Sequence, residues 1–262
     1  MNMNVEELRT FFARRVVGRR IEYFEEVEST NSEALRLAQQ GAPEGTVVMA
    51  DAQTRGRGRL DRVWESPPSK NLYLSVLLRP DIPAVSSSLI PLMTGVAVAE
   101  VVAQYCPGRV RLKWPNDVLV GGKKICGMLT EMRTRGDRVQ FVIIGIGLNV
   151  NMARLDFPRG LRETATSLRI ETGCEAQRLD AAARLFEQTE RWYRIFLQGD
   201  SAAIRETWLR YADIVGRRVE VVFGNGVQRG TVSGLDASGA LVLEGETGAQ
   251  RVLAGDVYIE RL

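Results

Sequence analysis

The sequence contains no histidine, and this absence restricts its chemistry more than any other feature of its composition. Without an imidazole, Ser-His and Cys-His nucleophilic pairs, histidine acid–base catalysis and most zinc sites are excluded. An enzyme of this composition must therefore act by positioning its substrates and by fixed charge. Such an enzyme is feasible, because orientation alone can supply roughly 7–11 kcal/mol of a reaction barrier.

Cysteine, aromatic residues and excess charge are also scarce. The three cysteines, at 106, 126 and 174, are an odd number without metal-ligand spacing, so each is predicted to be a small buried hydrophobic residue. The net charge of +3 and the aromatic content of 7% argue against a dedicated nucleic-acid-binding protein, which needs a strongly basic face and exposed rings for stacking.

Long apolar runs are missing as well. No run is long enough to cross a bilayer, and residues 1–15 lack the continuous apolar stretch of a signal peptide, so we expect a cytoplasmic protein. The 262 residues, of which 45% are hydrophobic, suffice for one large domain with a substantial core and a smaller second domain.

The most informative segment that is present is DAQTRGRGRLDRVW, residues 51–64. Glycine allows main-chain N–H groups to approach a ligand closely, and guanidinium forks grip phosphate or carboxylate. Charge runs are usually solvated surface, and Gly/Arg stretches also serve as disordered nucleic-acid tethers. Because strand-like runs flank this segment on both sides, we interpret it as an anion-binding loop inside a folded domain.

Hydrophobic periodicity predicts alternating strands and helices up to about residue 213. Strands are expected at 21–27, 46–50, 72–78, 110–114, 118–120, 123–131 and 139–150, with a hairpin turn at Gly121-Gly122. Helices are expected at 31–40, 88–105, 166–171, 180–197 and 201–211, with a capping box at Thr30–Glu33 and caps at Asp180 and Ser201. Beyond residue 215, short strands split by turns indicate a small β-barrel, so a domain boundary is placed at 213–216.

Two polar motifs end predicted strands. Residues 28–31, Glu-Ser-Thr-Asn, lie at a strand-to-helix junction and suit either an ordinary helix cap or a small polar ligand. Residues 113–117, Lys-Trp-Pro-Asn-Asp, form either an ordinary turn after proline or a contact to nucleotide or metal.

Two further motifs lie within strands. Because a strand alternates its faces, one of Lys123 and Lys124 points inward, and an inward lysine near the arginine loop requires an anion between them. It is therefore a candidate electrostatic catalyst. Gly145 and Gly147 interrupt an apolar strand, which marks the close approach of a ligand or another backbone. Neither motif completes a dinucleotide fingerprint or a Walker loop.

In order and spacing, these motifs resemble the biotin protein ligases: EST-N, Q-x-x-GRGR-x-x-R-x-W, KWPND, a lysine followed by x-x-G, and G-x-G-x-N, dense over residues 20–152. The resemblance implies an α+β fold, in which a mixed β-sheet with flanking helices, as in biotin/lipoate ligases and class II synthetases, precedes a small SH3-like β-barrel. The implied division is an N-terminal extension at 1–20, a catalytic biotin/ATP-binding domain at 21–213 and an SH3-like domain at 214–262.

The resemblance also implies a two-step reaction. The biotin carboxylate attacks the α-phosphate of MgATP to give biotinyl-5′-AMP and pyrophosphate. A lysine of a biotin carboxyl carrier domain of acetyl-CoA carboxylase then takes the biotin and releases AMP. No covalent enzyme intermediate is needed, which suits a protein without histidine. The protein orients two anions and offsets their repulsion.

The family's site residues map onto this sequence by motif. The expected biotin-binding residues are Ser29, Thr30, Asn31, Gln53, Gly56, Arg57, Gly58, Arg59, Lys124, Gly127 and Gly145. The expected ATP or adenylate contacts are Arg59, Arg62, Trp64, Asn116, Lys124 and Asn149, and Asp117 is the candidate for placing magnesium. Lys124 and Arg59 are the expected catalytic residues, with Lys124 at the reacting carboxylate and α-phosphate.

The sequence departs from the family in the loop, which often reads GRGRRGR. Here Leu60 and Asp61 replace a basic residue and a glycine, which leaves loop flexibility and adenylate retention open.

Some relatives carry a winged helix-turn-helix domain. Only about twenty residues precede Ile21, so we expect a ligase without operator binding and without a membrane association. Homodimerisation and the choice of carrier protein are left open. The alternatives are a lipoate–protein ligase, which GRGR and KWPND disfavour, and a nucleic-acid-binding protein that uses the Gly/Arg loop.

Overall fold

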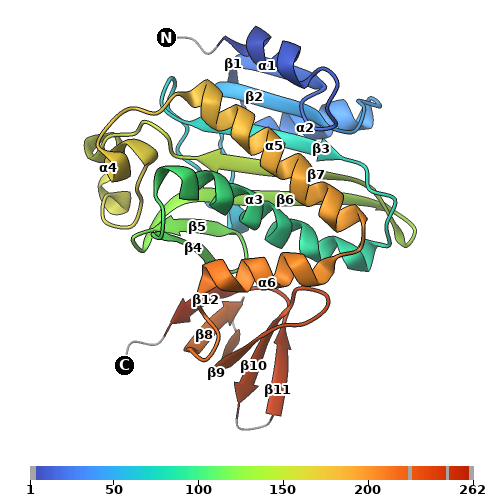
Figure 1. The fold of residues 1–262 in the computed structure, drawn as a ribbon, viewed down its shortest axis with the longest axis vertical. Helices are drawn as coiled ribbons and strands as arrows, with labels where there is room; N and C mark the ends of the chain where they lie inside the picture. The colour runs from blue at the N-terminus through green and yellow to red at the C-terminus, as the bar shows by residue number, and fades with distance from the viewer. Residues whose placement is uncertain (1–3, 224–225, 246–247, 260–262) are drawn as a thin grey trace.

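The computed structural model describes residues 4–223, 226–245 and 248–259. Its main element is a seven-stranded sheet with the strand order β1-β2-β3-β7-β6-β5-β4 (Figure 1). The strands are β1 (Arg20–Val27), β2 (Thr46–Gln53), β3 (Leu72–Leu78), β4 (Val110–Lys113), β5 (Asp117–Val120), β6 (Lys123–Arg135) and β7 (Arg138–Leu148). β1 and β2 are parallel and the other neighbouring pairs are antiparallel, which confirms the predicted mixed sheet.

Helices cover the sheet on both faces. They are α1 (Val5–Phe12), α2 (Thr30–Gln39), α3 (Ile90–Tyr105), α4 (Leu168–Thr172), α5 (Arg178–Leu197) and α6 (Ser201–Ala212), with 3-10 helices at Arg59–Asp61, Ala84–Leu89, Arg154–Asp156 and Arg159–Leu161. α3, α5 and α6 pack together on one face (Figure 1). α2 packs on β2, β3 and β7. It covers the opposite face of the sheet: Ile143 of β7 belongs to the hydrophobic cluster around α2, whereas the next residue, Ile144, points to the main core.

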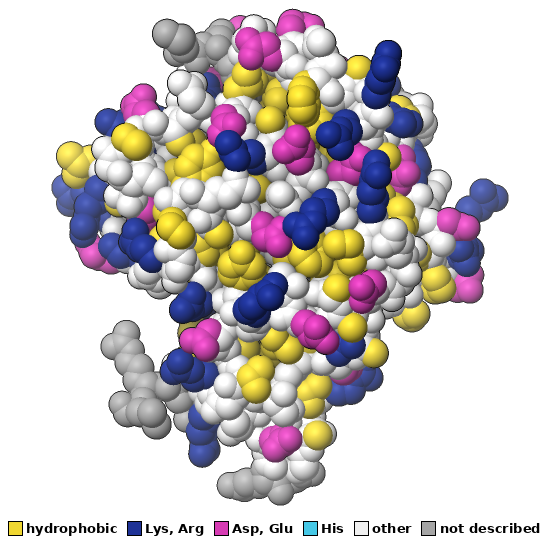
Figure 2. Space-filling view, in the orientation of Figure 1, with side chains coloured by type: hydrophobic (Ala, Val, Ile, Leu, Met, Phe, Trp, Pro, Cys, Tyr) yellow, Lys and Arg dark blue, Asp and Glu magenta, His cyan; other side chains and the backbone are white. Residues whose placement is uncertain are grey.

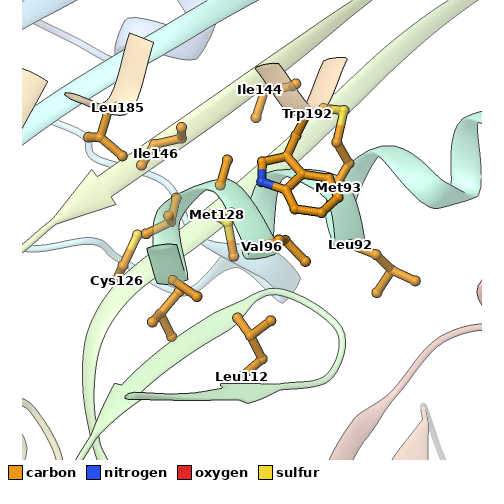
Figure 3. Close-up of a cluster of buried hydrophobic side chains, with 14 of the residues drawn as sticks. Leu92, Met93, Val96, Leu112, Cys126, Met128, Ile144, Ile146, Leu185 and Trp192 are labelled. Carbon is orange, nitrogen blue, oxygen red and sulfur yellow. The ribbon is translucent and has the colours of Figure 1, made fainter. Parts of the chain in front are cut away.

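The main core lies between the sheet and α3. Figure 3 shows Met93 and Val96 of α3 among Met128 of β6, Ile144 of β7 and Trp192 of α5. α3 is apolar almost all round, which is typical of a helix buried on every side. On the face of the protein that Figure 2 shows, basic and acidic side chains are interspersed, in keeping with the small net charge.

The prediction that no apolar run is long enough to cross a bilayer was wrong. Ala84–Tyr105 is 22 residues long, and its most apolar stretch has a mean hydropathy of 1.7, so the segment is long and apolar enough to cross a bilayer. In the fold, two thirds of its most apolar stretch is buried inside the protein (67%), and α3 packs against α5, α6 and the sheet. Its hydrophobicity therefore has a structural cause, since this helix supplies the centre of the core.

The segment expected to be an N-terminal extension contributes to the same core. Val5, Leu8 and Phe12 of α1 are buried, and the rings of Phe12 and Phe186 meet edge to face with centroids 5.1 Å apart. Residues 5–12 thus complete the packing around α5. Residues 1–3 lie outside the described part of the chain.

Three predicted helix caps were wrong. Ser29 is the N-cap of α2, and Glu33 pairs with Arg36 and does not close a capping box. α5 begins at Arg178, so Asp180 lies inside its first turn. The N-cap of α6 is Asp200, whose carboxylate accepts a hydrogen bond from the Ala203 N–H at 3.0 Å. Neighbouring polar residues offer equivalent caps, so the sequence locates these ends only to within one to three positions.

The cysteine predictions were right for two of the three residues. Cys106 and Cys126 are buried, and burial raises the pKa of the Cys126 thiol well above its usual range. Cys174 is exposed, so its predicted burial was wrong. It follows the short helix α4 in a surface connection, where apolarity alone does not place a residue in the core.

The C-terminal module is a five-stranded antiparallel sheet in the order β11-β10-β9-β8-β12, in agreement with the small β-module of short strands that the sequence predicted. Its strands are β8 (Arg218–Phe223), β9 (Gly226–Leu235), β10 (Leu241–Gly245), β11 (Gly248–Val252) and β12 (Asp256–Ile259). Val219, Val221 and Leu241 are among its buried residues. The module lies beside α6 (Figure 1). Asp256, the first residue of β12, lines a cavity that is otherwise formed by the main sheet, the start of α2 and the connecting loops. The division at 213–216 remains a proposal, and residues 260–262 lie outside the described residues.

Candidate active site

A cavity of about 460 Å³ lies at the N-terminal end of α2, on the sheet face that α2 covers. This volume is within the range of small-molecule sites. Its walls come from the start of α2, the Arg/Gly loop, β6, β7 and β12. The predicted site residues that line it are Ser29, Thr30, Asn31, Gln53, Arg57, Gly58, Arg59, Arg62, Trp64, Asn116, Asp117, Lys124, Gly127, Gly145 and Asn149. The fold thus brings nearly the whole predicted set together.

Gly56 is the predicted site residue that does not line the cavity. A Cβ atom at this position would lie 2.2 Å from the Trp64 carbonyl oxygen. The Trp64 N–H also donates to the Gly56 carbonyl at 2.9 Å. The glycine therefore allows the two arms of the Arg/Gly loop to pair closely.

One end of the cavity is lined by Ser29, Thr30, Asn31 and Gln53. We call these residues, together with the buried Ser75 that contacts Thr30 and Asn31 from behind, the polar end. The Thr30 N–H and hydroxyl both donate to Gln53 Oε1, at 2.9 and 3.2 Å. Ser75 Oγ lies 2.8 Å from Thr30 Oγ1 and 2.6 Å from Asn31 Oδ1. Thr30 and Asn31 are each 4% exposed. The polar end is therefore a preformed array of uncharged donors and acceptors.

Gly145, the first glycine of the strand motif, leaves room for the Asn31 side chain. A Cβ atom there would lie 2.2 Å from Asn31 Oδ1. The prediction of a close approach was right, but the approaching group is the Asn31 side chain and not another backbone.

The floor of the cavity is a glycine pair under Trp64. Gly127 of β6 and Gly147 of β7 are register partners. A Cβ atom on them would lie 2.9 and 2.4 Å from the indole ring. The indole Nε1 is buried and has no hydrogen-bond partner among the described residues. The two glycines therefore create the space in which this ring lies flat against the sheet.

The Arg/Gly loop is a short hairpin. Arg57 and Val63 form an antiparallel bridge, and the Gly58 N–H donates to the Arg62 carbonyl at 2.7 Å. At its tip, Leu60 and Asp61 have φ values of 55° and 56°. This left-handed conformation costs roughly 1–2 kcal/mol per non-glycine residue. The two departures from the family pattern therefore occupy the most strained turn of the loop.

The opposite end of the cavity, the charged end, consists of Arg59, Arg62, Asn116, Asp117, Lys124 and Asp256. Arg62 pairs with Asp256 at 2.6 Å, and this hydrogen bond raises the pKa of the Arg62 guanidinium. Arg59 donates to Asn116 Oδ1 at 2.9 Å and lies 3.6 Å from Asp256. Asp256 starts β12, 194 residues after Arg62, and nothing local in the sequence could have identified it.

Lys124 is the inward lysine of the hairpin. It lines the cavity and lies 5.5 Å from the Trp64 ring centroid, whereas Lys123 does not line the cavity. Its Nζ is 2.7 Å from Asp117 Oδ1, outside hydrogen-bonding geometry, and this buried oxygen has no hydrogen-bond partner among the described residues. The anion that the sequence required beside this lysine is thus supplied by the protein itself.

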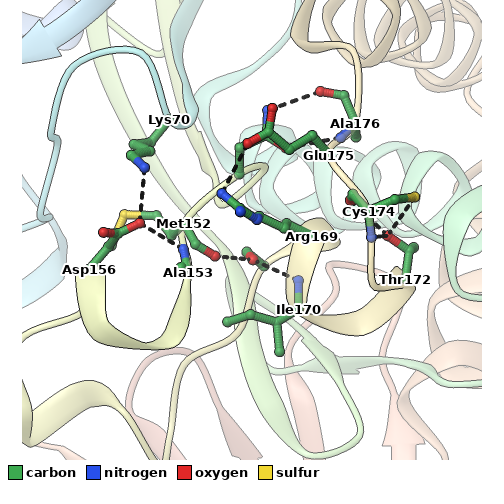
Figure 4. Close-up of polar contacts among 12 residues, drawn as sticks. Lys70, Met152, Ala153, Asp156, Arg169, Ile170, Thr172, Cys174, Glu175 and Ala176 are labelled. Carbon is green, nitrogen blue, oxygen red and sulfur yellow. Dashed lines mark hydrogen bonds and ion pairs between the residues drawn. The ribbon is translucent and has the colours of Figure 1, made fainter.

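The remaining wall is formed by the chain segment after β7. It is apolar, and Met152, Phe157 and Leu161 line the cavity there. Figure 4 shows how this irregular segment is fixed: Lys70 pairs with Asp156 at 3.2 Å, and the Ala153 N–H donates to Asp156 at 2.7 Å. Sequence reasoning missed this wall because it has no periodic pattern.

Asn149 belongs to the same wall. Its Nδ2 donates to the Thr166 carbonyl at 2.9 Å, and its Oδ1 accepts from Asn71 at 3.4 Å. Its side chain is only 4% exposed. In this geometry Asn149 holds the wall to the sheet.

Comparisons with known proteins agree with this arrangement. Residues 23–149 match the biotin/lipoate A/B protein ligase family, and residues 214–259 match the biotin protein ligase C terminal domain. The chain is 37% identical over 257 residues to a Bacillus spizizenii protein named bifunctional ligase/repressor BirA, covering 98% of this chain and 79% of that protein. It is 34% identical over 236 residues to the biotin–[acetyl-CoA-carboxylase] ligase of Paracoccus denitrificans, covering 88% of this chain and 97% of that protein.

A solved structure is similar as well. The biotin protein ligase from Aquifex aeolicus in complex with biotin and ATP has a TM-score of 0.75 and 29% identity, covering 93% of this chain and 100% of that chain. The two matched domains and the similarity over nearly the whole chain agree with one another. The chain therefore belongs to the biotin/lipoate A/B protein ligase family, as a biotin protein ligase.

Proposed function

We propose that this chain activates biotin with ATP to give biotinyl-5′-AMP and transfers the biotin to a lysine of a biotin carboxyl carrier domain. One observation carries the proposal: a single cavity joins an uncharged hydrogen-bonding end to a cationic end. The first suits the neutral ureido ring of biotin, and the second suits the phosphates of a nucleotide. The two substrates would meet where these ends adjoin.

The first step needs two anions brought into contact. Lys124 Nζ is the cation on the cavity floor, and Gly127 beside it carries no side chain. We place the biotin carboxylate and the α-phosphate at Lys124, which would offset their repulsion and the charge that grows as the new P–O bond forms and pyrophosphate leaves. Arg59 would hold the phosphate from the loop side, and Arg62 and Asn116 would extend this contact. No histidine is required.

Magnesium would enter with ATP as part of that substrate. The structure describes no group of three or more acidic or cysteine side chains that could hold a metal. Magnesium usually binds through one or two carboxylates together with substrate phosphates and water. Asp117 is a carboxylate of the charged end that fits this role, and its buried Oδ1, which lies 2.7 Å from Lys124 Nζ, would exchange this contact for the metal.

The second step would be the attack of a carrier lysine on the mixed anhydride, forming an amide and releasing AMP. The Paracoccus relative is named for acetyl-CoA carboxylase, so we propose the carrier domain of that enzyme as the partner. The folded Arg/Gly loop would retain the adenylate until the carrier arrives. A cytoplasmic location and the absence of operator binding remain predictions from the sequence, and homodimerisation stays open.

The test has two parts. Radiolabelled pyrophosphate should enter ATP only when biotin and magnesium are both present, and lipoate should not replace biotin. Mass spectrometry of a carrier domain incubated with protein, MgATP and biotin should then reveal one added biotinyl group. Exchange driven by lipoate would favour the lipoate alternative, and no exchange with either acid would refute the proposal.

The nucleic-acid alternative has less support in the structure. The loop arginines have internal acidic partners: Arg55 pairs with Glu28, Arg57 with Glu131, and Arg59 and Arg62 with Asp256. A loop neutralised in this way has little free charge for a polyanion's backbone. Tight single-strand binding that neither biotin nor ATP affects would reverse this preference.

A further inference from the structure

Glu131 lies outside the cavity yet contacts two residues that line it. It is on β6, on the same strand face as Gly127 and Leu129. Its Oε2 atom accepts a hydrogen bond from Asn31 Nδ2 at 2.7 Å and another from the Arg57 guanidinium at 2.8 Å. One carboxylate oxygen therefore joins the polar end of the cavity to the Arg/Gly loop.

The Asn31 side chain is fully engaged in this arrangement. One Nδ2 proton serves Glu131 and the other reaches the Leu129 carbonyl at 3.2 Å, while Oδ1 lies 2.6 Å from Ser75 Oγ. An asparagine amide has two donors and one carbonyl acceptor, so little capacity is left for a ligand. Asn31 thus acts as a fixed link between Glu131 and the rest of the polar end.

A continuous chain of contacts runs from this link across the cavity. It passes from Arg57 through Glu131 and Asn31 to Ser75, Thr30 and Gln53, and Gln53 Nε2 donates to Ser66 Oγ at 2.8 Å. Ser66 in turn donates to the Trp64 carbonyl at 2.9 Å. Arg57 and Trp64 are in the two arms of the loop. Both arms are therefore held through the groups predicted to bind biotin.

The ion pair between Glu28 and the loop residue Arg55 makes no such connection to the cavity. Its side chains are 61% and 78% exposed, and neither residue lines the cavity. Such a pair contributes little, because solvent screens it. Glu131 is about one-third exposed, and one of its two partners is buried. The two pairs have the same charges and each contains one arginine of the Arg/Gly loop, so they form a matched contrast.

From this geometry we infer that Glu131 is a positioning residue, which holds Arg57 against the polar end and thereby keeps the loop closed over bound biotin. The inference rests on the proposed function. It assigns a specific effect to Glu131: its loss loosens the retention of biotin and of the adenylate, with little effect on ATP binding or on the chemical step.

The experiment compares Glu131→Ala and Glu131→Gln with the control Glu28→Gln. In pyrophosphate exchange, we expect the KM for biotin to rise about 10- to 30-fold in Glu131→Ala and less in Glu131→Gln, which keeps one carbonyl acceptor. The KM for ATP and kcat should stay within about twofold, and Glu28→Gln should match the wild type. Calorimetric titration with biotin alone should give the same ratios without turnover.

A double-mutant cycle with Arg57→Ala identifies the partner. If Glu131 acts by holding Arg57, then the Glu131→Ala/Arg57→Ala double variant loses no more biotin affinity than the worse single variant. Strictly additive losses would overturn the inference, and so would a Glu131→Ala variant whose biotin affinity equals that of Glu28→Gln. A drop in kcat at constant KM for biotin would also contradict it.

Two controls keep this result separate from other failures. If Glu131→Ala does not fold, as judged by its melting temperature, the isosteric Glu131→Gln decides alone. If the wild type itself neither binds biotin nor catalyses exchange, the proposed function fails. If the wild type does both and the Glu131 variants are indistinguishable from it, only the inference about Glu131 fails.

Discussion

The two ends of the cavity are built on opposite principles. The polar end consists of uncharged side chains, and its core members Thr30, Asn31 and Ser75 are 4% exposed or less and already bonded to one another. The charged end consists of ion pairs, and the Arg62 side chain there is 63% exposed. One end can accept its ligand with little reorganisation, whereas the other must exchange an internal anion for the anion of the ligand.

The two ends also differ in which part of the fold supplies their hydrogen-bond and ion-pair partners. The contacts of the polar end lie within the main sheet and α2. The arginines of the charged end reach Asp256 of the C-terminal module. If the ends bind their substrates as proposed, nucleotide binding would depend on the position of that module, and biotin binding would not. Four substitutions test this difference between the two ends, and their expected effects decrease in the order given.

The largest effect is expected at the charged end, from Lys124→Ala. Removal of a cation at the reacting groups should lower the rate of pyrophosphate exchange about 10²–10³-fold. Lys123→Ala should stay within about threefold of the wild type, because Lys123 does not line the cavity. Exchange rates measured at saturating biotin and ATP test this, and equal losses in the two variants would contradict the assignment of Lys124.

Gly145→Ala tests the polar end alone. The new methyl group would lie 2.2 Å from Asn31 Oδ1 and must displace that side chain. Overpacking of this kind typically costs 1–3 kcal/mol, so the KM for biotin should rise about 10-fold or more while the KM for ATP is unchanged. Gly160→Ala is the control, since a Cβ there meets nothing within 4 Å. An equal rise in both KM values would show that the two ends are not independent.

Asp256→Asn tests the internal anion of the charged end. The change removes the charge that holds Arg59 and Arg62 and keeps the shape of the side chain. The KM for ATP should fall about two- to fivefold, in line with a partly exposed ion pair, and the KM for biotin should not change. Glu220→Gln, which breaks the exposed Glu220–Arg229 pair elsewhere in the module, is the control. A rise in the KM for ATP would mean that Asp256 positions the arginines and does not compete with phosphate.

The smallest effect is expected at the loop tip, from Asp61→Gly. Glycine adopts the observed φ of 56° without a steric penalty but loses more freedom on folding, so the free energy of unfolding should rise by at most about 1 kcal/mol. Asp61→Ala keeps the penalty and should give no gain. Denaturant titration measures both variants, and a loss of stability in Asp61→Gly would show that the turn is not strained.

The sequence located the loop, the lysine hairpin and the strand glycines because each carries a local signature. Charge alternating with glycine, a double lysine after Gly-Gly, and glycine within an apolar strand can all be recognised within a few residues. Strand and helix order also followed from periodicity, since burial on one face imposes that period along the chain. Three kinds of prediction were wrong: the helix caps, the burial of Cys174 and the length of the apolar segment at 84–105. In each case neighbouring residues give competing or ambiguous signals.

Local patterns in the sequence were enough to give the order of the strands and longer helices from residue 20 onward, the mixed sheet with its β-module, and many of the residues that line the cavity, but they did not give helix α1. Only the tertiary structure decided which groups meet: Asp256 with Arg62, Glu131 with both Asn31 and Arg57, and Trp64 with its glycine floor. The reason is physical. A pairing of two side chains depends on distance in space, and when up to 194 residues separate the partners, only the packing of the sheets and helices sets that distance.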